Sequence, residues 1–248
     1  MEPLRVMSFN VRYGTANDGP QAWPFRRHAA FEAIRTFHPH LLGVQEALAF
    51  QVAEIEEVLP GQGRLGVGRD DGVEAGEYAA IFYDAQRLSV AEAGTFWFSD
   101  HPDEPGSQFA DCYHPRICTW AIFGQGFAFY NLHLDNESGP SREKGVDILL
   151  SRLDRKVPTV VIGDFNTGED DRCIRAMRNA GFRDSYRVLH PEGPAVTYHD
   201  FGRGGNPEKI DYVWVDERWT VLDARIVDGR IDGVWPSDHH PVAATLAL

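Results

Sequence analysis

Six apolar segments of the chain end in polar side chains that can bind metal ions or transfer protons. These side chains are asparagine, aspartate, glutamate and histidine, and they occur at or beside residues 6–10, 41–46, 130–135, 160–166, 211–215 and 238–242. Each ending alone has an ordinary explanation, because such residues satisfy the backbone groups of loops. A hydrophobic core gains nothing from six of them together, whereas an open α/β sheet carries its chemistry at strand ends. We therefore interpret the set as one functional site.

The side chains in these segments favour two kinds of chemistry. Oxygen donors suit Mg²⁺ or Mn²⁺ better than Zn²⁺, and the chain offers them at Asn10, Glu46, Asp164 and Asn166. Asp211 and His239 could pair, and a carboxylate beside an imidazole fixes the orientation of the ring. The sequence thus predicts a site for a divalent cation with an oriented histidine beside it.

The elements that must position these residues are short apolar runs alternating with helix-like stretches. Helical periodicity predicts helices at about 24–37, 50–59, 141–156 and 172–180. Apolar runs predict strands at 4–11, 41–45, 78–83, 88–98, 117–123, 127–134, 159–162, 210–215, 221–227 and 242–246. This alternation, without repeats or a change in composition, predicts a single α/β domain with two sheets over residues 1–248.

Composition narrows the class of protein. The 248 residues are 43% hydrophobic, and no stretch approaches the roughly 18 apolar residues that a membrane span needs. No signal peptide is expected, because residues 1–5 lead straight into a strand-like run without a basic-then-apolar pattern. The odd number of cysteines, Cys112, Cys118 and Cys173, argues against a disulfide framework. We therefore expect a cytoplasmic protein. The net charge of −13 disfavours binding of a long polyanion without excluding a local basic patch.

The polar segments also carry a resemblance. In order, they are similar to the signature blocks of the endonuclease/exonuclease/phosphatase superfamily, namely Ser8-Phe9-Asn10-Val11-Arg12, Gln45-Glu46, Asn131-Leu132-His133-Leu134, Gly163-Asp164-Phe165-Asn166, Lys209-Ile210-Asp211-Tyr212 and Ser237-Asp238-His239. The blocks span nearly the whole chain. The resemblance implies a four-layered α/β sandwich like that of deoxyribonuclease I, with two mixed β-sheets packed face to face and helices outside.

The resemblance implies roles for three metal-site residues. Glu46 and Asn10 would hold a divalent cation, Mg²⁺ or Mn²⁺, and Asp238 would lie beside it or beside a second cation.

A second group of residues would act on the phosphate ester. Asp164 would orient or deprotonate the attacking water, and Asn166 would position the water and the phosphate. His239, paired with Asp211, would bind a phosphoryl oxygen and stabilise the charge that develops on it.

Two positions look closest to the deoxyribonuclease I branch of the superfamily. His133 lies where that branch has a second catalytic histidine, and Glu77 resembles the glutamate that orients this histidine. An ordinary surface glutamate before a strand is the other interpretation of Glu77. Arg116 is a candidate clamp for the phosphate, because its planar fork matches phosphate oxygens; a structural, salt-bridged arginine is the alternative.

The predicted function is hydrolysis of a phosphate ester, with a small-molecule substrate favoured and no protein partner expected. A nuclease is the main alternative. Repair endonucleases of the superfamily have an acidic residue at the position of Arg12, which argues against apurinic-site cleavage. Stacking on nucleic-acid bases would need exposed aromatic rings, and the candidates are Trp23, Phe25, Trp97, Phe98, Phe201 and Trp235.

Two further classes receive less support. A lipid-directed phosphodiesterase needs an apolar or basic membrane-facing surface, which the sequence does not reveal. A non-catalytic binding protein would be expected to have lost part of the polar set, which is present throughout. We expect the loops 15–23, 61–76, 99–115 and 199–209 to determine the substrate. Within the last of these, residues 202–206 are either a flap over the site or a surface turn.

Overall fold

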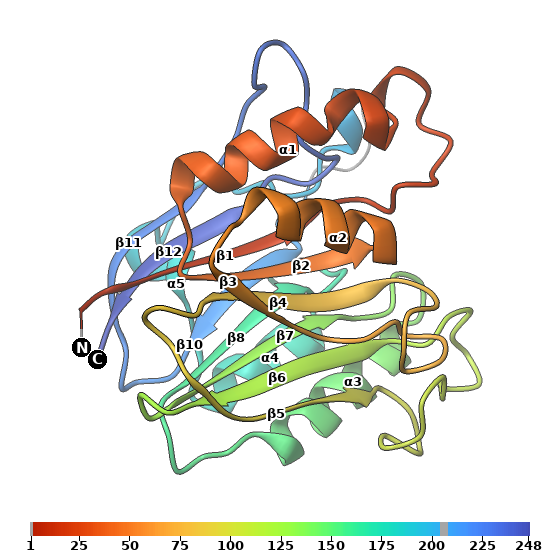
Figure 1. Ribbon diagram of the computed structural model, residues 1–248. Coiled ribbons are helices and arrows are strands. Elements are labelled where there is room, and N and C mark those ends of the chain that lie inside the picture. Colours follow the sequence, from red (N-terminus) through yellow and green to blue (C-terminus); the bar gives the residue numbers. More distant parts are fainter. Residues whose placement is uncertain (1, 204–207) are drawn as a thin grey trace.

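The computed structural model describes residues 2–203 and 208–248. Over these residues the chain forms two six-stranded sheets packed face to face, with helices on the outer face of each (Figure 1). This confirms the two sheets predicted from the sequence pattern and the four-layered arrangement that the family resemblance implied. The segment 202–206 lies largely outside the described residues. Within the described part, no helix is long and apolar enough to cross a membrane.

The first sheet contains both the earliest and the latest strands. Its order is β11-β12-β1-β2-β4-β3. Strands β1 and β2 are parallel and the other neighbours are antiparallel. The strands are β1 (Leu4–Asn10), β2 (Leu41–Ala47), β3 (Gln62–Leu65), β4 (Tyr78–Asp84), β11 (Thr220–Ile226) and β12 (Val242–Ala247).

The second sheet has the order β5-β6-β7-β8-β10-β9. Here β7 and β8 are parallel, and the remaining pairs are antiparallel. The strands are β5 (Val90–Trp97), β6 (Ile117–Phe123), β7 (Phe127–His133), β8 (Thr159–Asp164), β9 (Arg183–Asp184) and β10 (Asp211–Val215).

The core has three layers of apolar side chains. One fills the space between the sheets, with Val6, Ile81, Phe129 and Ile162 among its members. The second lies between the first sheet and its helices, α1 (Trp23–Phe37) and α2 (Ala49–Val58). The third lies between the second sheet and its helices, α3 (Gly139–Arg152) and α4 (Arg172–Asn179). Burial on both faces explains why most strands read as unbroken apolar runs.

A polar link joins the two sheets within this core. The side-chain nitrogen of Asn131, on β7, donates to the backbone oxygens of Val44 (3.0 Å) and Ala80 (2.8 Å) in the opposite sheet. Its side-chain oxygen accepts from Gln45 Nε2 at 2.6 Å. Gly43 leaves room for this link, because a Cβ there would lie 2.7 Å from Asn131 Cγ. The link therefore sets how the ends of β2 and β7 face one another.

The structure differs from the sequence prediction mainly in short elements. Strands β3 and β9 and the helix α5 (Ser185–Leu189) were not predicted, since elements this short show no readable periodicity. Helix α3 begins earlier than predicted, with Ser138 as its N-cap accepting from Ser141 N. It ends at Arg152, not at residue 156. The three cysteines are free and buried.

Candidate active site

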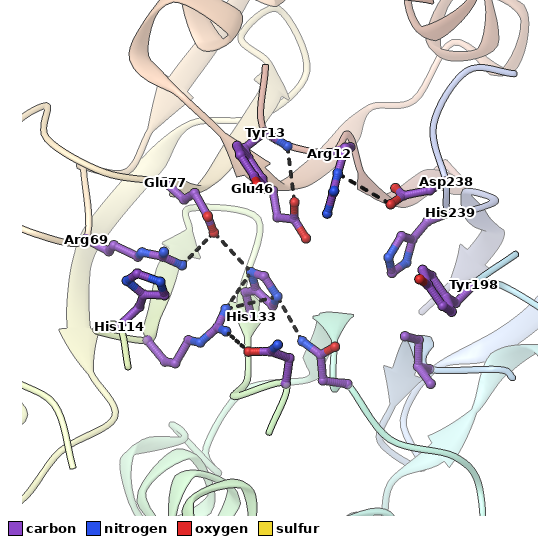
Figure 2. Close-up of a pocket in the computed structure, with 14 residues that line it drawn as sticks. Arg12, Tyr13, Glu46, Arg69, Glu77, His114, His133, Tyr198, Asp238 and His239 are labelled. Carbon is purple, nitrogen blue, oxygen red and sulfur yellow. Dashed lines mark hydrogen bonds and ion pairs between the residues drawn. The ribbon is translucent and has the colours of Figure 1, made fainter. Parts of the chain in front are cut away.

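A polar cavity of about 670 Å³ opens where the two sheets end (Figure 2). That volume lies within the range of small-molecule sites. Its lining combines acidic, basic and aromatic side chains: Arg12, Tyr13, Glu46, Arg69, Glu77, His114, Arg116, His133, Asn136, Asn166, Tyr198, Ile210, Asp238 and His239.

Strand register brings the predicted site residues to this cavity. In the second sheet, Asp164 at the end of β8 pairs with His133 of β7 and with Asp211 of β10. In the first sheet, β1 and β2 are parallel, so that Asn10 ends beside Gln45. β12 runs antiparallel to β1 and begins beside Ser8, which places the preceding residues 238–239 near the end of β1.

The backbone is unusual at three of these strand ends. Arg12, Glu46 and Asn166 have φ values of 57°, 62° and 52°, in the left-handed region that side chains other than glycine rarely adopt. Glu46 also lies in an irregularity where the pairing register of β2 with β4 shifts. Such irregularities redirect side chains, and left-handed non-glycine residues cluster at functional sites. The strand ends are thus shaped to turn these residues toward the cavity.

Gly163 supplies the close approach that β8 needs before Asp164. Its φ is 146°, and a Cβ there would lie 2.1 Å from the backbone oxygen of Leu132. Only glycine fits this position. The turn from Gly163 to Asn166 is held further by a hydrogen bond from Asn166 N to Asp164 Oδ1 (2.8 Å).

Glu46, Asp164 and His239 form a group that could hold a cation. One potential ligand atom from each lies within 4.8 Å of the others. Asn10 joins the two carboxylates, since its Nδ2 donates to Glu46 Oε1 (3.0 Å) and to Asp164 Oδ2 (2.9 Å). The oxygen of Asn10 accepts from the backbone nitrogen of Arg12 (2.9 Å). As placed, Asn10 therefore turns its nitrogen toward the carboxylates.

Burial and like charge change the acidity of Asp164. Its side chain is almost fully buried, and burial together with the nearby Asp211 raises its pKa to about 7, against the opposing effect of His239. A positive charge beside this carboxylate would remove the cost of ionising it. A divalent cation fits that requirement, as does the oxygen-rich donor set.

His239 is oriented by a buried carboxylate. Its Nδ1 lies 2.9 Å from Asp211 Oδ2, and its Nε2 lies 4.0 Å from Asp164 Oδ2. Burial alone would lower the pKa of His239, but Asp211, Asp164 and Asp238 raise it to about 10. The imidazole is therefore a charged donor at neutral pH. Because a protonated ring cannot ligate a metal, the carboxylates of Glu46 and Asp164 are the cation ligands in this group.

Asp238 faces a guanidinium. Its Oδ2 lies 3.6 Å from Arg12 Nε, and its Oδ1 accepts from Ser237 Oγ at 3.1 Å. Arg12 also contacts Asp18, at 3.3 and 3.4 Å. The carboxylate predicted beside the metal thus has a cationic side chain as its partner, at the position where repair endonucleases are acidic.

His133 is surrounded by N–H donors. Asn166 Nδ2 lies 2.9 Å from its Nε2, and Arg116 Nη1 lies 3.2 Å from the same atom. Burial lowers the pKa of His133 well below its usual range, and the positive charges of Arg116 and Arg69 act in the same direction. The ring is therefore neutral, with Nε2 as an acceptor.

Glu77 and Arg116 occupy the same wall of the cavity. Glu77 Oε2 lies 3.7 Å from His133 Nδ1, which is beyond hydrogen-bond distance, and accepts from Arg69 Nη1 at 2.5 Å. Burial and Glu46 raise the pKa of Glu77 to about 7. Arg116 Nη2 donates to Asn136 Oδ1 at 2.6 Å, and its Nε lies 3.6 Å from a carboxylate oxygen of Asp135. Glu77 lines the cavity and is not an ordinary surface residue.

Comparison with known proteins places the chain in a family. The model of the Endonuclease/Exonuclease/phosphatase family matches residues 7–239. The chain belongs to this family. No curated protein matches its sequence. An endonuclease/exonuclease/phosphatase from Bacteroides vulgatus is 30% identical, with all of both chains covered and a TM-score of 0.90.

Two further solved structures are similar to this chain. A mannosyl-6-phosphatase of Bacteroides thetaiotaomicron is 28% identical, covering 99% of this chain and all of the other, with a TM-score of 0.86. D. rerio TDP2, complexed with a single-strand DNA product, is 14% identical over the full length of both chains, with a TM-score of 0.77. The second likeness shows the shared fold alone.

In this member of the family, the predicted site residues all lie in or directly behind the cavity. Seven line it, namely Glu46, Glu77, Arg116, His133, Asn166, Asp238 and His239. Asn10, Asp164 and Asp211 lie behind them, connected by the hydrogen bonds given above.

Sequence reasoning missed several cavity residues. Arg69 and Tyr198 come from loops, and the sequence carries no strand-end signal for either. The ring of Tyr198 lies 5.0 Å from that of His239, centroid to centroid. Arg69 could have been noticed only through its partner Glu77, which pairs with it across the loop that precedes β4.

Most of the aromatic residues considered for base stacking are unavailable. Trp23, Trp97, Phe98 and Phe201 are buried, with at most 4% of each exposed. Trp235 packs against His199, with ring centroids 4.5 Å apart. Phe25 is the exception in this group, with 63% exposed.

Proposed function

We propose that this protein is a divalent-metal-dependent phosphoesterase that hydrolyses a small phosphate ester by attack of water on phosphorus. One observation carries the proposal: the carboxylates of Glu46 and Asp164 lie close enough to share a cation, at and directly behind a cavity that is also lined by Arg116, His133 and His239. One side suits a cation and the other suits phosphate oxygens.

The residues present fit Mg²⁺ or Mn²⁺. Glu46 is the ligand we propose first, because it is exposed to the cavity and its carboxylate belongs to the cation-binding group. Asn10 donates to Glu46, and Asp238 lines the same cavity beside Arg12; both are proposed to support the cation. When bound, such a cation would neutralise charge on the phosphoryl oxygens and lower the pKa of water.

Asp164 and Asn166 are proposed to handle the attacking water. Asp164 is buried directly behind the cavity, where Asn10 Nδ2 (2.9 Å) and Asn166 N (2.8 Å) hold its carboxylate in place to orient or deprotonate the water. Asn166 is exposed to the cavity and bridges His133 Nε2 and the backbone oxygen of Leu134 (3.0 Å). These contacts hold its amide in one orientation.

Charge on the phosphoryl group would be stabilised from two sides. His239 is held by Asp211 with its Nε2 available as a donor, and one well-aimed donor of this kind contributes about 3–4 kcal/mol to catalysis. On the opposite wall, Arg116 presents its guanidinium beside His133. Arginine binds phosphate in a bidentate manner.

Three observations support a small ester over a polynucleotide. The cavity has the volume of a small-molecule site, the chain carries a net charge of −13, and most candidate stacking rings are buried. The mannosyl-6-phosphatase at 28% identity is a relative whose name describes such a substrate. An endo- or exonuclease is the second candidate, for which the exposed rings of Phe25 and Tyr113 and the cavity-lining rings of Tyr13 and Tyr198 are candidate stacking platforms.

The test is hydrolysis with Mg²⁺ or Mn²⁺ of bis-p-nitrophenyl phosphate, p-nitrophenyl phosphate, a sugar phosphate, single-stranded DNA, duplex DNA and RNA. Asp164→Asn and His239→Ala should abolish turnover. Asp223→Asn is the matched control, because this aspartate pairs with Arg225 on the surface. Cleavage of small esters alone would support the proposal, and preferential cleavage of a polynucleotide would favour the nuclease. Inactivity without any metal binding would contradict both.

A further inference from the structure

A buried arginine outside the cavity lining connects two segments that form the site. Arg26 lies on α1 with 0% of the residue exposed. Its guanidinium donates three hydrogen bonds to backbone oxygens of three separate segments: Nε to Gln21 (2.9 Å), Nη1 to Pro236 (2.9 Å) and Nη2 to Arg12 (3.0 Å). One rigid, planar group thus fixes the spacing between them.

Two of these acceptors belong to the backbone of the active site. Pro236 directly precedes Ser237, Asp238 and His239. The backbone nitrogen of Arg12 donates to Asn10, which in turn contacts the carboxylates of the cation-binding group. The fork of Arg26 therefore joins the segment after β1 to the segment before β12.

Filling space in the core does not account for Arg26. The hydrogen bonds of its guanidinium go to backbone oxygens, and the group lies near the rings of Trp23 (5.0 Å) and Phe201 (5.7 Å). Burying a charge whose hydrogen bonds go to neutral acceptors is costly, and an apolar residue would avoid that cost. Burial lowers the pKa of Arg26 to about 10, against the opposing effect of Asp238, Asp18 and Glu46, so that the group is still charged at neutral pH.

We propose that Arg26 is a positioning residue that keeps the segments carrying Asn10 and His239 at the separation required for cation binding and phosphoester hydrolysis. This inference rests on the proposed function. Lysine at this position would keep the charge but lose the fork, because a single ammonium does not reproduce the geometry of three divergent N–H donors. Loss of such supporting contacts typically costs about 10–100-fold in metal affinity or activity.

The experiment compares Arg26→Lys and Arg26→Gln with the wild-type chain. Mn²⁺ affinity is measured by calorimetry, and Tm is measured by circular dichroism. The values of kcat and KM are measured with bis-p-nitrophenyl phosphate as the substrate. Arg183→Lys is the matched control, because Arg183 Nη2 also donates to two backbone oxygens, of Asp216 (3.1 Å) and Trp219 (2.6 Å), at residues that do not line the cavity.

We expect Arg26→Lys to remain folded, with Mn²⁺ affinity and kcat reduced about 10–100-fold and KM nearly unchanged. Arg183→Lys should keep both Mn²⁺ affinity and kcat. A folded Arg26→Lys with wild-type Mn²⁺ affinity would overturn the proposal. So would losses of Mn²⁺ affinity and kcat that are proportional to the decrease in Tm and equal in Arg26→Lys and Arg183→Lys. If Arg26→Lys does not fold, wild-type Mn²⁺ affinity of Arg26→Gln at a temperature below its Tm would overturn the proposal in the same way.

The Mn²⁺ measurement separates this proposal from the proposed function. A wild-type chain that binds Mn²⁺ but hydrolyses none of the esters would count against the choice of substrate, while the affinity of Arg26→Lys would still decide the positioning role. A wild-type chain that binds no Mn²⁺ would overturn both.

Discussion

His239 Nδ1 lies 2.9 Å from Asp211 Oδ2, and at most 5% of either residue is exposed. This contact fixes the direction of the imidazole and stabilises its protonated form, and Nε2 faces Asp164 and the cavity. The ring is held in the form that donates to an anion. Much of the proposed chemistry depends on this arrangement.

Replacement of Asp211 tests that dependence. Asp211→Asn keeps the shape of the side chain but removes the charge that raises the pKa of His239. We expect kcat to fall about 10–100-fold, with little change in KM and an unchanged circular dichroism spectrum. Asp223→Asn serves again as the surface control, and equal kcat values in the two variants would contradict the assignment.

Glu46 should govern the affinity for metal. Glu46→Gln removes the negative charge and leaves one acceptor oxygen, so that it can keep the hydrogen bond from Asn10 Nδ2 or that from Tyr13 N, but not both. We expect Mn²⁺ affinity to fall at least about tenfold and EDTA to abolish activity in the wild-type chain. Calorimetric titration measures the affinity. An unchanged value would remove Glu46 from the metal site.

Arg116 should affect binding of the phosphate more than folding. Arg116→Ala removes the guanidinium beside His133, whereas Arg116→Lys keeps the charge without the planar fork. We expect a raised KM and a lowered kcat in both, with the larger loss in alanine. The matched control is Arg152→Ala, because the guanidinium of Arg152 contacts Asp103 on the surface at 2.8 Å. Loss of stability without loss of activity would instead indicate a structural arginine.

Asn131 should matter for stability. Asn131→Leu would leave Gln45 Nε2 without its 2.6 Å acceptor, and the backbone oxygens of Val44 and Ala80 without this donor. Each buried group left unpaired costs about 1–3 kcal/mol. We expect the free energy of unfolding in urea to decrease by at least this amount. The exposed Asn179→Leu should change it little, and similar values for both would contradict the role of the link.

Stability should also fall on acidification because of His40. Its side chain accepts from Arg5 N at 3.0 Å and is buried, and burial with Arg5 and Arg87 lowers its pKa to about 4. In the unfolded chain the pKa returns to about 6.5. Above this value the ring is neutral in both states. As the pH falls toward 4, the ring gains a proton in the unfolded chain but not in the folded chain, and the free energy of unfolding therefore decreases.

Urea unfolding across the interval from pH 6.5 to pH 4 measures this effect. His40→Asn should flatten the decrease in the free energy of unfolding, whereas substitution of the exposed His28 should not. A wild-type chain whose stability is constant across that interval would contradict the prediction.

The strand ends were readable from sequence because the pattern that defines them is local. Asn10, Glu46 and Asp164 each come at the end of a mainly apolar run, and parallel neighbours bring such ends together. The resemblance then implied which strand ends meet, and the fold agrees. The register of β8 with β7 and β10 supplies the contacts of Asp164 directly.

The features of the site that could not be predicted from sequence depend on contacts between distant segments. Arg26 looks like one more polar residue of an amphipathic helix, and only the structure shows that its acceptors lie at residues 12, 21 and 236. The side chain of Arg69 reaches the cavity from a loop that carries no periodicity. The orientation of Asn10, with its nitrogen toward two carboxylates, is likewise a matter of tertiary geometry.

The pairing of β1 with β12 has a kinetic consequence. Asn10 and His239 meet only after strands far apart in sequence have joined, and such non-local pairing is slow because a long loop must close first. During refolding from urea, helical ellipticity should therefore return before enzymatic turnover does. The delay between the two signals would report how long the chain exists as a compact form that has its helices but no assembled catalytic centre.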